Sequence, residues 1–139
     1  MNGQSRTVLI VDDIPFVRKT LKQILTSHGY KIVGEAENGE QAIELYHENK
    51  PDLVTMDLVM PLMNGVEATR TIMRNYPDAK IIILSAMMQE NLVTEAILAG
   101  AKDYIVKPFN TEEVLKTISS VFEESTPRPS SVRTAGGAA

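Results

Sequence analysis

Cysteine is absent from the 139 residues of this chain. Its absence excludes disulfides, thiolate nucleophiles and cysteine-based zinc sites. No apolar run approaches the length that crosses a bilayer, and the N-terminal residues MNGQSR lack the apolar segment of a secretory signal. We therefore expect a cytoplasmic protein without a membrane partner.

Basic residues are too few and too scattered for a nucleic-acid surface. The chain has 14 Lys and Arg against 18 Asp and Glu, for a formal net charge of -4, and its basic residues form no stripe. Nucleic acid is therefore not an expected partner. With 43% hydrophobic and 23% charged residues, the composition is typical of a globular protein, and the length suits one domain with a substantial core.

Five apolar, strand-like runs alternate with five segments in which apolar residues recur at helical spacing. The expected strands are residues 7–11, 31–36, 53–56, 80–84 and 104–106. Helix starts are marked by Pro15 and by two capping-box pairs, Asn38 with Gln41 and Asn110 with Glu113. This alternation predicts an α/β fold, in which helices cover both faces of a parallel sheet.

The end of the chain differs in composition from the rest. Residues 125–139 (STPRPSSVRTAGGAA) are rich in Ser, Pro, Gly and Ala and contain almost no large apolar side chain. We expect one domain over residues 1–124, followed by a disordered tail or a cloning remnant.

Polar residues stand at the carboxyl ends of four expected strands. They are Asp12 and Asp13 after the first strand, Asp57 after the third, Ser85 after the fourth and Lys107 after the fifth. In an open parallel sheet these ends share one edge, and ligands bind outside it where the strand order reverses. The five side chains are therefore expected to meet.

Three carboxylates at one edge repel each other, by roughly 4 kcal/mol for a pair about 4 Å apart at an effective dielectric of 20. Such a cluster raises a pKa or recruits a cation, and magnesium (Mg²⁺) suits oxygen ligands and phosphate. Asp57 would then be a carboxylate nucleophile toward a phosphoryl group, with Lys107 neutralising charge and Ser85 donating a hydroxyl. Taken singly, each residue has a plainer interpretation as a turn, a helix cap or a solvated charge.

At these residues the sequence resembles the receiver domain of two-component response regulators, over about residues 7–124. Its extent is closest to the single-domain chemotaxis regulators of the CheY type. The resemblance rests on Asp12-Asp13, the D-x-x-M-P-x-M-x-G run of residues 57–65, Ser85-Ala86, Tyr104 and Lys107-Pro108-Phe109. It implies a flavodoxin-like (βα)5 three-layer sandwich with strand order 2-1-3-4-5.

The resemblance also implies a chemistry. A phosphohistidine of a CheA-like sensor histidine kinase would phosphorylate Asp57. Mg²⁺ would be held by Asp13, Asp57 and the backbone carbonyl of Val59, with Asp12 contributing through water. A cis peptide before Pro108 would aim Lys107 into the site. The protein is thus expected to be a phosphoacceptor that supports its own phosphorylation and slow dephosphorylation, not an enzyme.

A switch follows from the same resemblance. The Ser85 hydroxyl would move toward the phosphoryl group and Tyr104 would turn inward, which would change the face formed by the fourth helix, the fifth strand and the fifth helix. An effector, with the flagellar motor as the candidate in chemotaxis, would bind this face, and a phosphatase would end the signal. Val59 and Met87 are apolar and cannot orient an attacking water, so we expect slow spontaneous loss of the phosphoryl group.

Other functions are less compatible with the sequence. An aspartyl-phosphate phosphohydrolase of the haloacid-dehalogenase type needs a second acid where Val59 stands. A dinucleotide-binding fold needs a glycine-rich turn after the first strand, where Asp12 and Asp13 stand instead. A receiver from another pathway, or one cut from a longer regulator with the tail as a linker, remains an alternative.

Overall fold

Ten regular elements form the part of the chain that the computed structural model describes, residues 5–123. In order they are β1 (Thr7–Val11), α1 (Pro15–Ser27), β2 (Lys31–Ala36), α2 (Gly39–Asn49), β3 (Leu53–Asp57), α3 (Gly65–Asn75), β4 (Ile81–Ser85), α4 (Glu90–Leu98), β5 (Asp103–Val106) and α5 (Thr111–Glu123). All five expected strands form, and no end differs from its expected position by more than one residue. None of these helices is long and apolar enough to cross a membrane. The expected tail, residues 125–139, lies outside the described residues.

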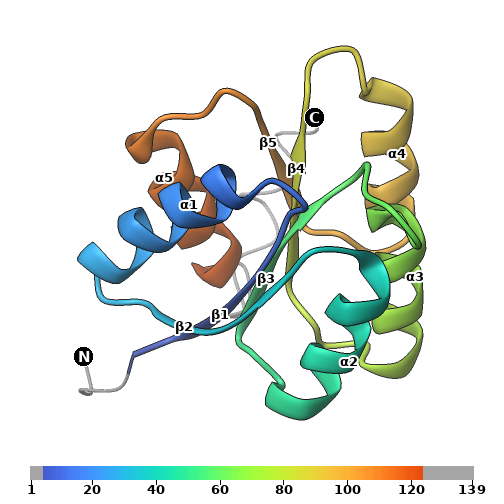
Figure 1. Ribbon diagram of the computed structural model, residues 1–139, viewed down its shortest axis with the longest axis horizontal. Helices are drawn as coiled ribbons and strands as arrows, with labels where there is room; N and C mark the ends of the chain where they lie inside the picture. The colour runs from blue at the N-terminus through green and yellow to red at the C-terminus, as the bar shows by residue number, and fades with distance from the viewer. Residues whose placement is uncertain (1–4, 124–139) are drawn as a thin grey trace, which may run out of the picture.

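The strands form one parallel sheet in the order β2-β1-β3-β4-β5. Helices α1 and α5 cover one face, and α2, α3 and α4 cover the other (Figure 1). This arrangement confirms the expected three-layer, flavodoxin-like sandwich and its strand order. Because β1 reverses the direction in which strands are added, its carboxyl end and that of β3 lie beside the crevice where such folds bind ligands.

Two hydrophobic cores explain why the central strands are almost entirely apolar. In β1, Val8 and Ile10 point into the core beneath α1 and α5, while Leu9 and Val11 point into the core beneath the other three helices. Successive strand side chains alternate between faces, so a strand covered on both faces needs an apolar residue at every position. Charged side chains therefore come where β1 and β3 leave the core, although β3 also holds one buried polar side chain, Thr55.

Capping residues set where helices begin after these strands. The Asn38 side chain accepts a hydrogen bond from the backbone N–H of Gln41 at 2.9 Å. Asn110 and Glu113 bond reciprocally, side chain to backbone, at 2.8 and 3.4 Å. Both expected capping pairs are confirmed, and each satisfies backbone N–H groups that the first helical turn leaves unpaired.

Candidate functional site

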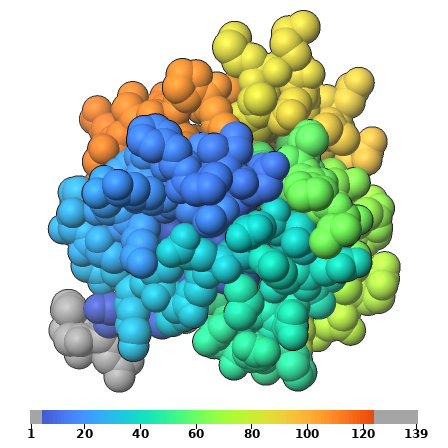
Figure 2. All heavy atoms as spheres, in the orientation of Figure 1, coloured from blue at the N-terminus to red at the C-terminus, as the bar shows by residue number. Residues whose placement is uncertain are grey.

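Loops from four strands converge at the carboxyl edge of the sheet (Figure 1). Oxygen atoms of Asp12, Asp13 and Asp57 lie within 4.8 Å of one another there. The ammonium of Lys107 reaches two of these acids, and Ser85 ends the adjacent strand β4. Figure 2 shows the surrounding segments side by side near the top of the molecule: the start of α1 in blue, the β3–α3 loop in green and the β5–α5 segment in orange. The structure therefore brings the acids and the lysine together as expected.

Asp12 is fully buried, and each of its polar groups has a partner. Its Oδ1 accepts from the backbone N–H of Ile14 at 2.9 Å, and its Oδ2 accepts from Lys107 Nζ at 2.9 Å. Its backbone N–H donates to the carbonyl of Ala36 at 3.0 Å, and its carbonyl accepts from Arg18 Nη1 at 2.7 Å. Asp12 is thus a fixed part of the site rather than a mobile ligand.

Asp57 is also buried, with 6% of its surface exposed. Its Oδ1 accepts from the backbone N–H of Leu58 at 3.0 Å and from Lys107 Nζ at 3.3 Å. Burial, and then the charge of Asp12, raise the pKa of Asp57 to about 6, although Lys107 opposes the shift. The cluster therefore holds more negative charge than Lys107 balances, as the sequence predicts. The effect is seen in the raised pKa of Asp57.

Lys107 is the cation that faces this charge. Burial alone lowers the pKa of Lys107, but the hydrogen bond to Asp12 and the charges of Asp57 and Asp12 outweigh it and raise the pKa. The peptide bond between Lys107 and Pro108 is cis, as expected. The backbone N–H of Lys107 donates to the carbonyl of Ser85 at 2.7 Å, which ties this loop to the end of β4.

Asp13 differs from Asp12 in both its exposure and its contacts. Its side chain is exposed, and within residues 5–123 it has no hydrogen-bond or ion-pair partner. Lys107 pairs with Asp12 and Asp57 but not with Asp13, so the Asp13 carboxylate is available to bind a cation. The acidic cluster offers only hard oxygen donors, and it is compatible with Mg²⁺.

The loop after Asp57 depends on Gly65. Its backbone N–H donates to the carbonyl of Leu58 at 2.8 Å, and a Cβ at this position would lie 2.0 Å from the carbonyl oxygen of Asp57. Only glycine permits this close approach, which gives a physical reason for the glycine that ends the D-x-x-M-P-x-M-x-G run. The side chain of Val59 is exposed in the same loop, and its carbonyl as a cation ligand stays a prediction.

Ser85 and Tyr104, the two expected switch residues, lie on the neighbouring strands β4 and β5. Ser85 is buried at the end of β4, and no hydrogen bond joins its hydroxyl to the acids in the part of the chain that the structure describes. Tyr104 is about half-exposed on β5 and lines a groove of about 580 Å³ between α4 and β5. The rest of the groove is mainly apolar and includes Met87, Met88, Val93, Ile97 and Leu98. Movement of either switch residue stays a prediction.

Arg18 belongs to the site, although no pattern in the sequence indicates it. Its guanidinium contacts the backbone carbonyl of Asp12 from one turn inside α1. A side chain that binds a backbone carbonyl leaves no paired pattern in the sequence. The only available signal was a positively charged residue on the first helix five positions after the acidic pair.

Comparisons with known proteins agree with this geometry. The family model of the response regulator receiver domain matches residues 8–119. The chain is 54% identical to the chemotaxis protein CheY of Thermotoga maritima over 116 residues, which cover 84% of this chain and 97% of that protein. It is 52% identical to CheY of Bacillus subtilis over 115 residues, covering 83% and 96%. A solved CheX-CheY-BeF3-Mg+2 complex from Borrelia burgdorferi is similar with a TM-score of 0.81 at 41% identity, covering 84% of this chain and 89% of that one.

Proposed function

Because this chain belongs to the family of response regulator receiver domains, it is a phosphorylation-activated two-component switch, and we propose that Asp57 accepts the phosphoryl group in a chemotaxis pathway. The observation that carries the proposal is a buried carboxylate at a strand end, paired with a lysine and close to two further acids. A carboxylate in this position is desolvated, oriented and next to a fixed cation, as a nucleophile toward phosphorus must be.

The two oxygens of Asp57 differ in a way that suits this role. Oδ1 is held by the backbone N–H of Leu58 and by Lys107, whereas Oδ2 accepts no hydrogen bond within residues 5–123. Oδ2 is therefore the proposed attacking atom. An Oδ2–P bond forms as the P–N bond of a phosphohistidine breaks, and the leaving imidazole takes a proton from solvent. Lys107 holds the carboxylate in place and offsets negative charge on the transferring oxygens.

We propose Asp13 and Asp57 as direct Mg²⁺ ligands, with Asp12 contributing through water. The difference between the two neighbours supports this division, since every polar group of Asp12 is engaged and the carboxylate of Asp13 is not. When bound, Mg²⁺ would neutralise the oxygens of the transferring phosphoryl group.

The protein is a signalling phosphoacceptor rather than a classical enzyme. We propose that it supports its own phosphorylation from small phosphodonors and loses the group slowly. Val59 is 54% exposed and Met87 is 70% exposed, and neither side chain can hydrogen-bond a water. Val59 also occupies the place of the second acid that a phosphohydrolase would need, so turnover is not favoured.

Receiver domains take their phosphoryl group from a kinase and pass the signal to other proteins, and a CheX-CheY complex is among the solved neighbours. For this chain we propose a CheA-like sensor histidine kinase as the donor. The proposed effector site is the α4–β5–α5 face, because the groove beside Tyr104 is apolar and exposed there. A flagellar motor protein is the proposed effector, a phosphatase is the proposed terminator, and the proposed location is the cytoplasm.

Phosphotransfer tests the acceptor directly. A labelled, phosphorylated CheA-like kinase is mixed with the chain in Mg²⁺, beside the Asp57→Asn variant. The label is expected to move to the unmodified chain, to stay on the kinase with the variant, and to stay there when EDTA removes the metal. A label that appears on Asp57→Asn would place the acceptor elsewhere.

A further inference from the structure

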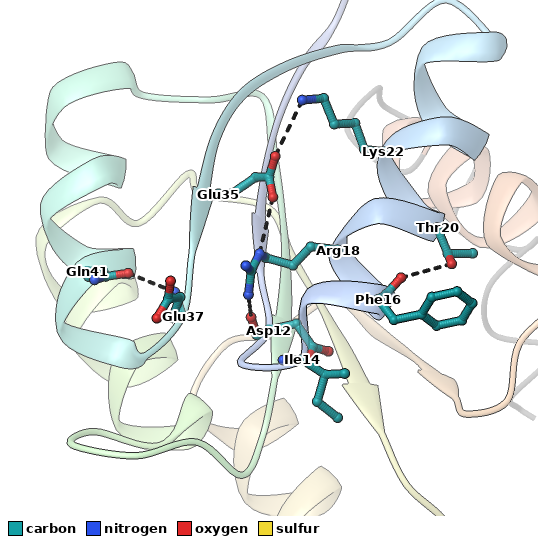
Figure 3. A network of polar contacts seen from close by, with 9 residues as sticks. All are labelled: Asp12, Ile14, Phe16, Arg18, Thr20, Lys22, Glu35, Glu37 and Gln41. Atoms are coloured by element: carbon teal, nitrogen blue, oxygen red, sulfur yellow. Dashed lines mark hydrogen bonds and ion pairs between the residues drawn. The ribbon is translucent and has the colours of Figure 1, made fainter.

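Arg18 connects the acidic cluster to the edge of the sheet. Its Nη1 donates to the carbonyl of Asp12 at 2.7 Å, and its Nε donates to Oε1 of Glu35 at 3.1 Å. Lys22, one turn later on α1, donates to the other oxygen of Glu35 at 3.4 Å. Figure 3 shows Arg18 between Asp12 and Glu35, with Glu35 reaching it from β2. Only 13% of the Arg18 side chain is exposed, so the guanidinium is held in one place.

The carbonyl that Arg18 holds belongs to the peptide plane between Asp12 and Asp13. This plane is rigid, so it can turn only by changing ψ of Asp12 and φ of Asp13, and any change that is not compensated between these two angles displaces Cβ of Asp13 and the carboxylate attached to it. The backbone N–H of Asp12 is held by the carbonyl of Ala36, and Oδ1 of Asp12 holds the backbone N–H of Ile14 on the far side of Asp13. The Asp13 side chain has no partner of its own within residues 5–123, so only the backbone around it restrains its position.

We propose that Arg18 is a positioning residue that sets the cation affinity of the acidic cluster by fixing the Asp12–Asp13 peptide plane, and that Glu35 keeps Arg18 in place. The inference rests on the proposed function, because it takes Asp13 as a Mg²⁺ ligand. Arg18 acts only through the backbone carbonyl and contacts none of the three carboxylates of the cluster in the described hydrogen bonds. It is therefore not a catalytic residue.

The sign of the effect separates positioning from simple electrostatics. A positive charge near a cation site repels the cation, so removal of the Arg18 charge alone should strengthen Mg²⁺ binding. Loss of the contact with the Asp12 carbonyl should weaken it, because Asp13 would no longer be held at the cluster. Loss of a group that holds a metal ligand in place typically lowers the metal affinity by about 10–100-fold.

Calorimetric titration with Mg²⁺ of the full chain, Arg18→Met and Lys22→Met tests the proposal. Lys22→Met is the matched control, since it removes a charge from the same helix and one contact of Glu35 but leaves the Asp12 carbonyl held. We expect Arg18→Met to bind Mg²⁺ at least about tenfold more weakly and the control to bind as the unmodified chain does or more tightly. The Mg²⁺ concentration for half-maximal phosphorylation by acetyl phosphate should rise in the same proportion, while the rate at saturating Mg²⁺ stays close to that of the unmodified chain.

A second pair of variants carries the test if Arg18→Met does not fold by circular dichroism. Glu35→Ala frees the guanidinium and should weaken Mg²⁺ binding, whereas Glu35→Gln keeps an oxygen for Arg18 Nε and should restore it. Unchanged or tighter binding by Arg18→Met, or by Glu35→Ala, would overturn the proposal and leave the proposed function intact. An unmodified chain that does not bind Mg²⁺ would overturn both.

Discussion

Lys107 Nζ lies 3.3 Å from Oδ1 of Asp57, although the two residues are 50 positions apart in the chain. They come from the ends of β5 and β3, which are separated in the sheet by β4. Such a contact across β4 requires that β3 and β5 end at the same edge of the sheet. It also requires that one of the two side chains is long enough to reach the other. The same ammonium binds Asp12 at 2.9 Å, so one lysine faces two buried carboxylates. The charge imbalance at this edge leads to the first prediction.

The first prediction concerns stability against pH without metal. Asp57 has a pKa of about 6 in the folded chain, above its ordinary value of 3.8, so the folded state keeps this proton more strongly than the unfolded state does. The stabilising contribution is present below about pH 4 and is lost as the pH rises through 6. At about 1.4 kcal/mol per pKa unit, ionised Asp57 costs the folded state on the order of 3 kcal/mol at pH 7.

Replacement of Asp57 by Asn removes that charge. In EDTA at pH 7.5 (roughly physiological), Asp57→Asn should therefore unfold at a higher urea concentration than the unmodified chain, and the difference should disappear toward pH 4. Urea unfolding followed by circular dichroism at a series of pH values checks this. A difference that does not change with pH would mean that Asp57 is not the residue whose titration affects folding.

The second prediction concerns Asp13 and magnesium. A ligand that binds only the folded state stabilises it by about 2.7 kcal/mol at 100 times its dissociation constant. Mg²⁺ should raise the melting temperature of the unmodified chain, and Asp13→Ala should lose most of this increase, because Asp13 is the carboxylate without another partner. Truncation after residue 124 is the control, and it should keep the increase. An equal increase in Asp13→Ala would assign the metal to other residues.

Much of this site could be predicted from the sequence for a physical reason. A strand buried on both faces has little room for charged side chains, so Asp57 at the end of LVTM and Asp12 at the end of TVLIV mark the points where strands leave the core. Parallel order then places those points on one edge.

The contacts that fix the site could not be predicted in the same way. Arg18 binds a backbone carbonyl, and Gly65 avoids a clash with one, so neither shows a pattern of paired side chains. Both depend on how closely the start of a helix approaches a strand end. That distance is set by packing of the whole helix, so even the motif that ends at Gly65 does not show which backbone atom requires a glycine there.

The third prediction concerns the lifetime of the phosphoryl group. Val59 is exposed beside the site and carries no group that could orient water, so its replacement by Asn should speed dephosphorylation of the Mg²⁺-bound form. Leu62→Asn is the control, since Leu62 lies in the same loop, is 78% exposed and has a positive φ that Asn tolerates. Decay of the label after removal of the donor measures the rate. Rapid decay in the unmodified chain that Val59→Asn does not change would contradict the proposed effect of the apolar pair.

The fourth prediction concerns the switch at Tyr104. The chain has no tryptophan, so Tyr104→Trp would provide a single fluorophore on β5. Tyr104 is 48% exposed and borders the groove toward Ser85, and an inward turn would remove the ring from water. Acetyl phosphate with Mg²⁺ should therefore shift the emission of Tyr104→Trp to shorter wavelength.

The shift should be absent when Asp57→Asn is added, because no phosphoryl group forms. It should be smaller with Ser85→Ala, because the hydroxyl that would follow the phosphoryl group is missing. Emission that stays constant while Asp57 is phosphorylated would show that β5 does not report the state of the site.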